Sequence, residues 1–204
     1  MTSIPKPPPL LRTCHTCVAL CALCLLPACS GEGALTGAAM EAAGLRKPVP
    51  PVPEAQQAPR SVALRLHAAR RLNVDARGQP LALLVRVYKL RQRAAFDQAP
   101  YAAFLSAQAE RDALGTDLID VKEVTLVPGQ QLELADKLAR EAAYLGVVAL
   151  FHSPARNGWR LAFAAPEAEK SGVTVGLHAC AMSVGAGAAA NGTGIKSLSL
   201  VRCQ

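Results

Sequence analysis

The stretch Leu81-Ala-Leu-Leu-Val-Arg-Val-Tyr-Lys-Leu90 decides how this chain folds. Leu83, Val85 and Val87 occur at every second position, while Arg86 and Tyr88 occupy positions between them. Successive side chains of a strand point to opposite faces of a sheet, so this spacing places the three aliphatic residues on one face. The stretch therefore predicts a β-strand with a buried face.

Five further segments have the length and the alternating or β-branched composition of strands. They are Val62–Ala68, Val121–Val127, Tyr144–Phe151, Trp159–Phe163 and Val173–Cys180. Turn signals such as Pro128-Gly129 separate them, and strands and helices do not alternate regularly. This order predicts an all-β fold, a β-sandwich, over residues 61–184.

Two segments depart from the strand pattern. Residues 100–114 predict a helix that Gly115 ends, with Phe104 and Leu105 on its apolar face. Residues 134–143 are ambiguous, because their apolar residues recur at helical spacing while strands flank them. Helices are therefore expected to be few and accessory to the strands.

The N-terminal segment has the organisation of a secretory signal. Lys6 and Arg12 give it a basic start, and the apolar core from Cys17 to Leu26 has 10 residues. A helix that spans a bilayer needs about 20 apolar residues, whereas a cleaved signal has a core of about 7–15. The segment is therefore expected to be removed rather than folded.

Cys29 closes the sequence Leu26-Pro-Ala-Cys29 at the end of this core. A cysteine there is the lipid acceptor of bacterial lipoproteins, so we predict removal of residues 1–28 and a covalent lipid on Cys29. Because Ser30 follows rather than an aspartate, the expected destination is the outer membrane. Pro27 departs from the usual motif, and the alternative is ordinary cleavage to a soluble periplasmic protein.

A low-complexity segment separates Cys29 from the predicted sandwich. Glycine and alanine fill its first half, and Lys47-Pro-Val-Pro-Pro-Val-Pro-Glu54 lies in the second. Alternating proline and valine favour extended polyproline II, a semi-rigid spacer. We therefore predict a tether over residues 29–60, or a segment partly packed on the domain. Residues 185–204 are predicted to be a Gly/Ala-rich hinge followed by one more strand, residues 195–201.

Seven cysteines occur in the chain, and five of them lie in the signal or at its end. Cys180 and Cys203 remain, and an even pair in an oxidising compartment is a disulfide candidate. The bond would enclose 22 intervening residues and stabilise the fold by about 3 kcal/mol. Two free thiols are the alternative.

The remaining motifs argue against catalysis and against nucleic-acid binding. The net charge of +7 includes two cations of the signal, and the basic residues form no stripe. His67, His152 and His178 lie far apart and lack the spacing of zinc ligands. Neither a phosphate-binding loop nor a nucleophile motif occurs. We expect no enzymatic activity, no metal, no nucleic-acid partner and no cofactor besides the lipid on Cys29.

Several segments, in the same order along the chain, are similar to the type VI secretion lipoprotein family (TssJ, VasD or Lip). The opening match is Arg71-Leu-Asn-Val-Asp-Ala-Arg-Gly-Gln-Pro80, followed by Val85-Arg-Val-Tyr-Lys-Leu90. The similarity continues through Val127-Pro-Gly129, Tyr144–Ala149 and Trp159. The resemblance implies a transthyretin-like β-sandwich with short accessory helices and no enzymatic activity, anchored to the inner leaflet of the outer membrane.

The resemblance also implies a partner and a site. Family members bind the periplasmic C-terminal region of the inner-membrane protein TssM and help to build the trans-envelope secretion complex. The loop between their first two strands contributes to that contact, and here this loop comprises residues 70–80. The residues predicted to bind the partner are then Asn73, Val74, Asp75, Ala76, Arg77 and Gly78. An ordinary solvated hairpin, or a periplasmic carrier or carbohydrate-binding sandwich of the same architecture, is the alternative.

Overall fold

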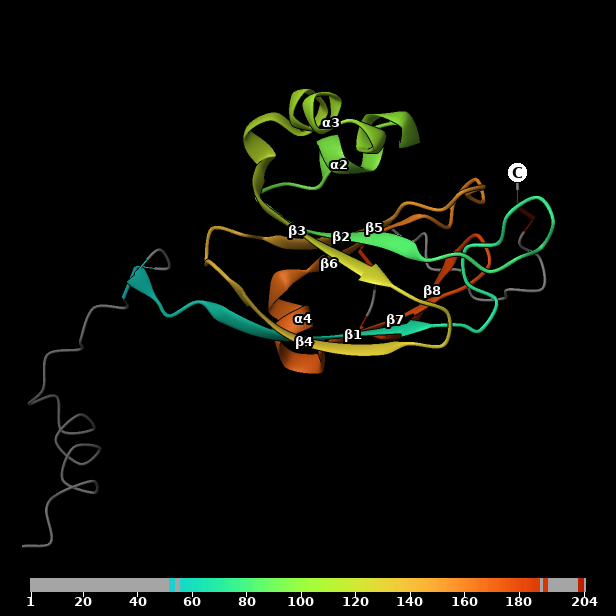
Figure 1. Cartoon of the computed structure of the whole chain (residues 1–204). Coiled ribbons are helices and arrows are strands. Elements are labelled where there is room, and N and C mark those ends of the chain that lie inside the picture. The colour runs from blue at the N-terminus through green and yellow to red at the C-terminus, as the bar shows by residue number, and fades with distance from the viewer. Residues whose placement is uncertain (1–51, 54–55, 188, 191–201, 204) are drawn as a thin grey trace, which may run out of the picture. The chain divides into compact units, whose positions relative to one another are not determined.

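Two four-stranded sheets form the body of the molecule (Figure 1). The computed structural model describes residues 52–53, 56–187, 189–190 and 202–203. The strand orders are β4-β1-β7-β8 and β3-β2-β5-β6, so the predicted β-sandwich with accessory helices is confirmed. The predicted signal, Cys29 and most of the predicted tether lie outside the described residues.

The elements have the following bounds. The first sheet is built from β1 (Arg60–Ala68), β4 (Gln131–Leu138), β7 (Val173–Leu177) and β8 (Met182–Ala186). The second is built from β3 (Leu118–Leu126), β2 (Leu83–Leu90), β5 (Tyr144–Ala149) and β6 (Arg160–Ala164). Between β2 and β3 lie α2 (Ala94–Gln98), α3 (Ala107–Leu114) and the 3-10 helices η2 (Tyr101–Leu105) and η3 (Gly115–Asp117). Helix α4 (Ala165–Ser171) joins β6 to β7.

The core lies between the two sheets and follows the period of two in the sequence. In β1, Leu64 and Leu66 are fully buried, and in β2 Leu83 and Val85 are fully buried as well. All four belong to one hydrophobic cluster. Since each completely buried aliphatic side chain contributes roughly 1.5–3 kcal/mol, these alternating residues supply much of the stability of the fold.

The segment over residues 134–143, whose spacing was ambiguous, begins as part of a strand. β4 pairs antiparallel with β1, and Leu134 lies opposite Leu64. Residues at even positions from Leu132 to Leu138 are at least partly buried, while those between them are exposed. A spacing of four residues fits both a helix turn and two strand repeats, so pairing with β1 decides between them.

The helix predicted over residues 100–114 is divided, and its predicted apolar face is partly wrong. Ser106 has an extended backbone, and its Oγ accepts a hydrogen bond from the N–H of Ala109 at 3.4 Å, which makes it the N-cap of α3. Leu105 therefore ends η2 and is 61% exposed, while Phe104 is buried. Gly115 follows α3 with a φ of 53°, as expected for a residue that ends a helix.

These helices cover the outer face of the second sheet (Figure 1). Tyr88 is fully buried beneath them and donates a hydrogen bond to the carboxylate of Glu110 on α3. Arg86 Nη1 lies 3.2 Å from both carboxylate oxygens. Burial raises the pKa of Tyr88, so its hydroxyl remains a donor at neutral pH. The polar face of β2 thus fixes the helices to the sheet.

Arg160, at the start of β6, fixes the end of α2. Its guanidinium donates to the carbonyl oxygens of Phe96 at 2.6 Å and Ala99 at 2.7 Å, where the helix leaves carbonyls without partners. It also lies 4.6 Å from the ring centroid of Trp159. All eight aromatic side chains of the chain belong to the hydrophobic cluster or pack against it.

The last two strands of the sandwich, β7 and β8, differ in their bounds from the prediction. The single strand expected over Val173–Cys180 stops at Leu177, and the chain reverses through residues 178–181 into β8. The N–H of His178 donates to the carbonyl of Ala181 at 2.9 Å and closes this turn. β8 continues to Ala186, so the Gly/Ala-rich segment begins about two residues later than predicted.

Candidate functional site

The loop between β1 and β2, residues 69–82, is organised around Asn73. This side chain is only 5% exposed. Its Nδ2 donates to the carbonyl of Ala82 at 2.7 Å, and its Oδ1 accepts from the N–H of His152 at 2.6 Å. Its φ of 46° lies in the left-handed region, which asparagine tolerates better than most residues. Asn73 is therefore a framework residue that joins its own loop to residues 150–159.

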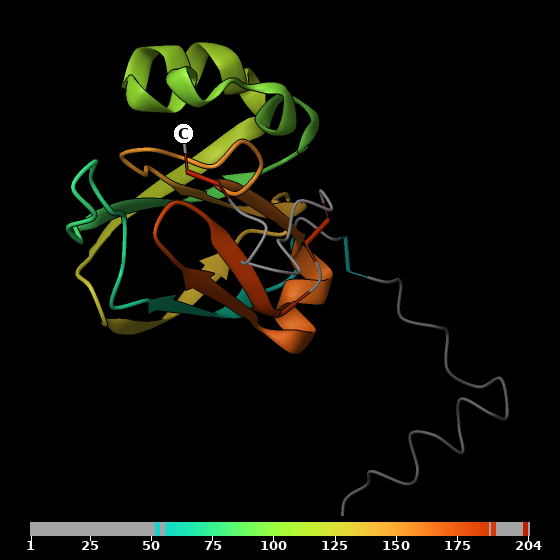
Figure 2. The ribbon, with the colours of Figure 1, turned by 90° about the vertical axis from the view of Figure 1, so that its right-hand side faces the viewer.

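Backbone hydrogen bonds join a third loop to the first two. Asn73 N–H donates to the carbonyl of His178, and Val74 N–H to that of Ala179, each at 3.0 Å. Ala155 N–H, in turn, donates to the carbonyl of Cys180 at 2.9 Å. Loops 69–82, 150–159 and 178–181 therefore form one surface, here called the loop end. They gather at the right of Figure 1, the side that faces the viewer in Figure 2.

The tip of the first loop is exposed but well ordered by hydrogen bonds. Asp75 Oδ1 accepts from the backbone N–H of Arg77 at 2.9 Å and of Gln79 at 2.8 Å. These hydrogen bonds, that from Gln79 foremost, lower the pKa of Asp75. Gly78 has a φ of 77°, which lets the chain turn back toward β2. The tip thus presents a defined shape to solvent.

The structure divides the six residues of the predicted site into two groups. Asn73 is buried, and Val74 and Asp75 are half-buried. Ala76, Arg77 and Gly78 are exposed at the tip. Nothing in the sequence indicates that the other two loops lie beside this one, although asparagine is a residue type that tolerates positive φ in a turn. Ala76, Arg77 and Gly78 are therefore the most accessible of the six residues, and Asn73 is the least accessible.

The predicted disulfide is confirmed and lies at the same end of the molecule. Cys180 and Cys203 are bonded, with their Cα atoms 5.6 Å apart. The chain beyond β8 first reaches β6, where Ala189 forms an antiparallel bridge with Phe163. The strand predicted over residues 195–201 lies outside the described residues. The bond therefore returns the C-terminal residues to the loop end.

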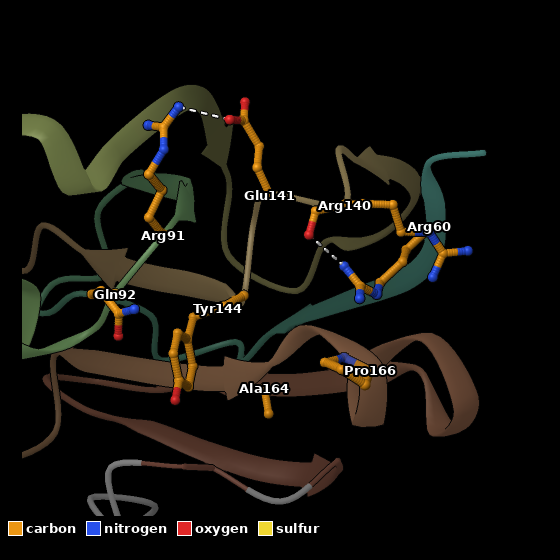
Figure 3. A pocket seen from close by; sticks show the side chains of 9 residues that line it. Arg60, Arg91, Gln92, Arg140, Glu141, Tyr144, Ala164 and Pro166 are labelled. Carbon is orange, nitrogen blue, oxygen red and sulfur yellow. Dashed lines mark hydrogen bonds and ion pairs between the residues drawn. The ribbon is translucent and has the colours of Figure 1, made fainter. Parts of the chain in front are cut away.

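The opposite end of the sandwich, where the chain enters at Arg60, is here called the entry end and contains a cavity of about 620 Å³ (Figure 3). Arg91 Nη2 lies 2.7 Å from Glu141 Oε2. Arg60 Nη1 donates to the carbonyl of Arg140 at 3.0 Å. Glu169 Oε2 lies 3.7 Å from Arg60 Nε and also 3.7 Å from Arg140 Nη1. The cations of this cavity are thus already paired within the protein, which fits a structural role.

The described residues offer little for cofactor chemistry. No group of three or more His, Cys, Asp or Glu side chains within them is arranged to hold a metal ion. Nor does any helix in the described ranges have the length and apolar character to cross a bilayer. His178 Nε2 lies 2.8 Å from Ser183 Oγ, and burial lowers the pKa of this histidine. The distinctive feature of the molecule is therefore a surface of joined loops.

The sequence matches a family model of type VI secretion lipoproteins (VasD, EvfM, TssJ) over residues 60–180. The chain belongs to this family. The match begins at β1 and ends at Cys180, so it covers β1 to β7 and stops before β8 and the residues that lead to Cys203. No protein with a curated description matches the chain.

Solved structures agree with this assignment. The lipoprotein TssJ1 of Pseudomonas aeruginosa is 32% identical, with a TM-score of 0.57, and the similarity covers 63% of this chain and 96% of that one. A chain of the structure described as "Type VI membrane complex" is 27% identical, with a TM-score of 0.56 and coverage of 61% and 97%. A chain of the structure described as the T6SS protein TssM C-terminal domain from EAEC is also 27% identical, with a TM-score of 0.52 and the same coverage.

Proposed function

We propose that this protein is a non-enzymatic lipoprotein of the type VI secretion membrane complex that binds the periplasmic C-terminal domain of TssM. Its lipid would be attached to Cys29 and hold it at the periplasmic face of the outer membrane. The family match supports the lipoprotein and its secretion system. Similar chains in structures described as a type VI membrane complex and as the TssM C-terminal domain support the partner.

The observation that carries the proposal is the construction of the loop end. Hydrogen bonds that Asn73 and Val74 donate or accept join three loops that are distant in the sequence. Above them the tip from Ala76 to Gln79 is exposed. Loops held on a rigid sandwich are a common place for binding. A preorganised surface also loses less conformational entropy when a partner binds.

The carbohydrate-binding alternative has less support. Sugar-binding surfaces usually offer aromatic rings to the ligand, and this chain has eight aromatic residues. Six of them are buried in the core, while Tyr101 and Tyr144 pack against it. The aromatic side chains thus pack within the core or against it, where they also hold the helices on the sheet.

Binding of the purified mature protein to the TssM C-terminal domain tests the proposal. Ala76→Trp places a bulky side chain on the exposed tip and should weaken binding at least tenfold without unfolding the domain. Ala135→Trp makes the same change on exposed β4 and serves as the matched control. Equal affinity of both variants would move the interface away from the tip, and no binding by the unchanged protein would reject the partner.

The lipid anchor is tested separately by mass spectrometry of the protein purified from membranes. Diacylglycerol on the sulfur of Cys29, at a new N-terminus, is the expected result. An unmodified N-terminus would reject the anchor and leave the partner-binding proposal to the experiment above.

A further inference from the structure

The loop end carries an excess of positive charge. Four exposed arginines lie in its loops, Arg70, Arg71, Arg77 and Arg156, and a fifth, Arg202, precedes Cys203, which is bonded to Cys180 at the loop end. Loops 69–82, 150–159 and 178–181 contain a single acid, Asp75, whose Oδ2 lies 3.4 Å from Arg77 Nε. Within the part of the chain that the structure describes, the other four guanidinium groups have no acidic partner. The surface therefore presents cations that the fold itself does not neutralise.

Contacts of neighbouring residues place the backbone of these arginines on the surface. Arg71 lies beside the tip, since a Cβ built on Gly78 would be 3.9 Å from its Nη2. Arg156 follows Ala155, whose N–H is bonded to the carbonyl of Cys180. Arg202 precedes Cys203, which is bonded to the same Cys180. The disulfide thus brings Arg202 to loop 178–181, which is hydrogen-bonded to the loop that carries Arg156.

We propose that the loop end is a cationic docking surface for an acidic face of the partner protein. Arg156 and Arg202 would extend the contact beyond the 70–80 loop. This inference rests on the proposed function and adds the chemistry that the partner must offer. Opposite charges across an interface accelerate association and select against wrong partners. Arg202 lies outside the residues matched by the family model, so the family assignment does not bear on its contribution.

An anionic lipid surface has the same charge, but the placement of the arginines favours a protein. The chain enters the sandwich at Arg60, and β1 runs from there to Ala68 beside the loop end, a distance of roughly 26 Å at about 3.3 Å per residue. The chain that precedes Arg60 therefore joins the sandwich at the end opposite these arginines. The hydrogen bonds among the loops also fix a shape, which a protein surface can match and a fluid bilayer does not require.

Association rates with the TssM C-terminal domain, measured at low and at high salt, test the inference. The variant Arg156→Glu/Arg202→Glu reverses the charge of the two arginines that lie outside the 70–80 loop and leaves that loop unchanged. The matched control is Lys122→Glu/Lys137→Glu, on exposed positions of β3 and β4. We expect the arginine variant to associate at least tenfold more slowly at low salt, with a weaker salt dependence, and the control to change less than twofold. Urea unfolding of each variant verifies that the fold is intact.

The outcomes separate this inference from the proposed function. If Ala76→Trp blocks binding while the arginine variant behaves like the control, the partner stands and the extended cationic surface is rejected. If the unchanged protein does not bind, both are rejected. A third experiment measures capture of the Cys29→Ser protein, which carries no lipid, by vesicles of phosphatidylglycerol and by vesicles of phosphatidylcholine. Capture by the anionic vesicles alone, lost in the arginine variant, would assign the surface to lipid and overturn the inference.

Discussion

The two ends of the sandwich use arginine in opposite ways. At the entry end, Glu141 and Glu169 lie beside Arg60, Arg91 and Arg140, and backbone carbonyls accept further hydrogen bonds from them. At the loop end, four of the five exposed arginines have no acidic partner among the described residues. A paired arginine fastens the fold, whereas an unpaired one on the surface is available to another molecule. The sequence shows the same residue type at both ends, and only the contacts distinguish the roles.

The comparison also separates framework from surface within the loop end itself. Asn73 lies inside and holds three loops together, while Arg77 and Gly78 lie outside on the tip. Substitutions of framework residues should alter the stability of the fold. Substitutions of surface arginines should alter binding and leave stability nearly unchanged.

The largest effect on stability is expected from Asn73→Ala. The substitution leaves the carbonyl of Ala82 and the N–H of His152 without their partners and places alanine at a φ of 46°. At about 1–3 kcal/mol for each unsatisfied group and about 1 kcal/mol for the backbone, the free energy of unfolding should fall by about 4 kcal/mol. Urea unfolding measures it, and Asn73→Gly, which relieves only the backbone, should recover about 1 kcal/mol. A loss below 1 kcal/mol for Asn73→Ala would show that the loops do not depend on this side chain.

Removal of the disulfide should have the next largest effect. Cys203→Ser opens a link between residues 23 apart in the sequence, which should lower the free energy of unfolding by about 3 kcal/mol. The same change should slow association with the TssM domain, because Arg202 is no longer held at the loop end. Dithiothreitol should reproduce both effects in the unchanged protein and have none in Cys203→Ser. Two reactive thiols in denatured, unreduced protein would contradict the bond.

A pair of matched variants tests whether the arginines at the two ends have different roles. Arg60→Met removes the donor to the carbonyls of Arg140 and Ala142 at the entry end and should cost about 2 kcal/mol of stability. It should leave the association rate unchanged. Arg156→Met, at the loop end, should change stability by less than about 0.5 kcal/mol and slow association. Equal stability losses, or equal binding losses, would show that the two ends do not differ in this way.

Much of the fold could be predicted because burial imposes a period on the sequence. Leu83, Val85 and Val87 reveal β2 without reference to any neighbour, and β1 shows the same alternation. The break at Ser106 could not be found in this way, since Phe104 and Leu105 fit one helix equally well. A serine that caps a helix is recognised only when the chain before it is extended. Pairing with β1 likewise decided the nature of β4.

The site was less predictable, because its loops meet only in three dimensions. The resemblance pointed to residues 70–80, yet nothing in the sequence indicated that Arg156 lies at the same end. Two hydrogen bonds create that proximity: the N–H of His152 donates to Asn73 Oδ1, and the N–H of Asn73 donates to the carbonyl of His178. The disulfide was predictable from the count of cysteines, whereas its effect on the position of Arg202 required the loop that carries Cys180.

The smallest effect, on the pH dependence of stability, concerns the tip. Hydrogen bonds from the backbone of Gln79 and Arg77 stabilise the carboxylate of Asp75 and hold its pKa below the ordinary value of 3.8. A depressed pKa contributes stability that is present above pH 3.8 and is lost as the pH falls through the lower value in the folded protein. Asp75→Asn keeps an oxygen acceptor but carries no charge, so its stability should fall less steeply with acid below pH 4, while at pH 7 the two proteins should differ little. NMR titration of the Asp75 carboxyl group gives the pKa directly. A value at or above 3.8 would mean that the tip is not ordered by these two hydrogen bonds, and the preorganised tip would then no longer distinguish the loop end from an ordinary exposed turn.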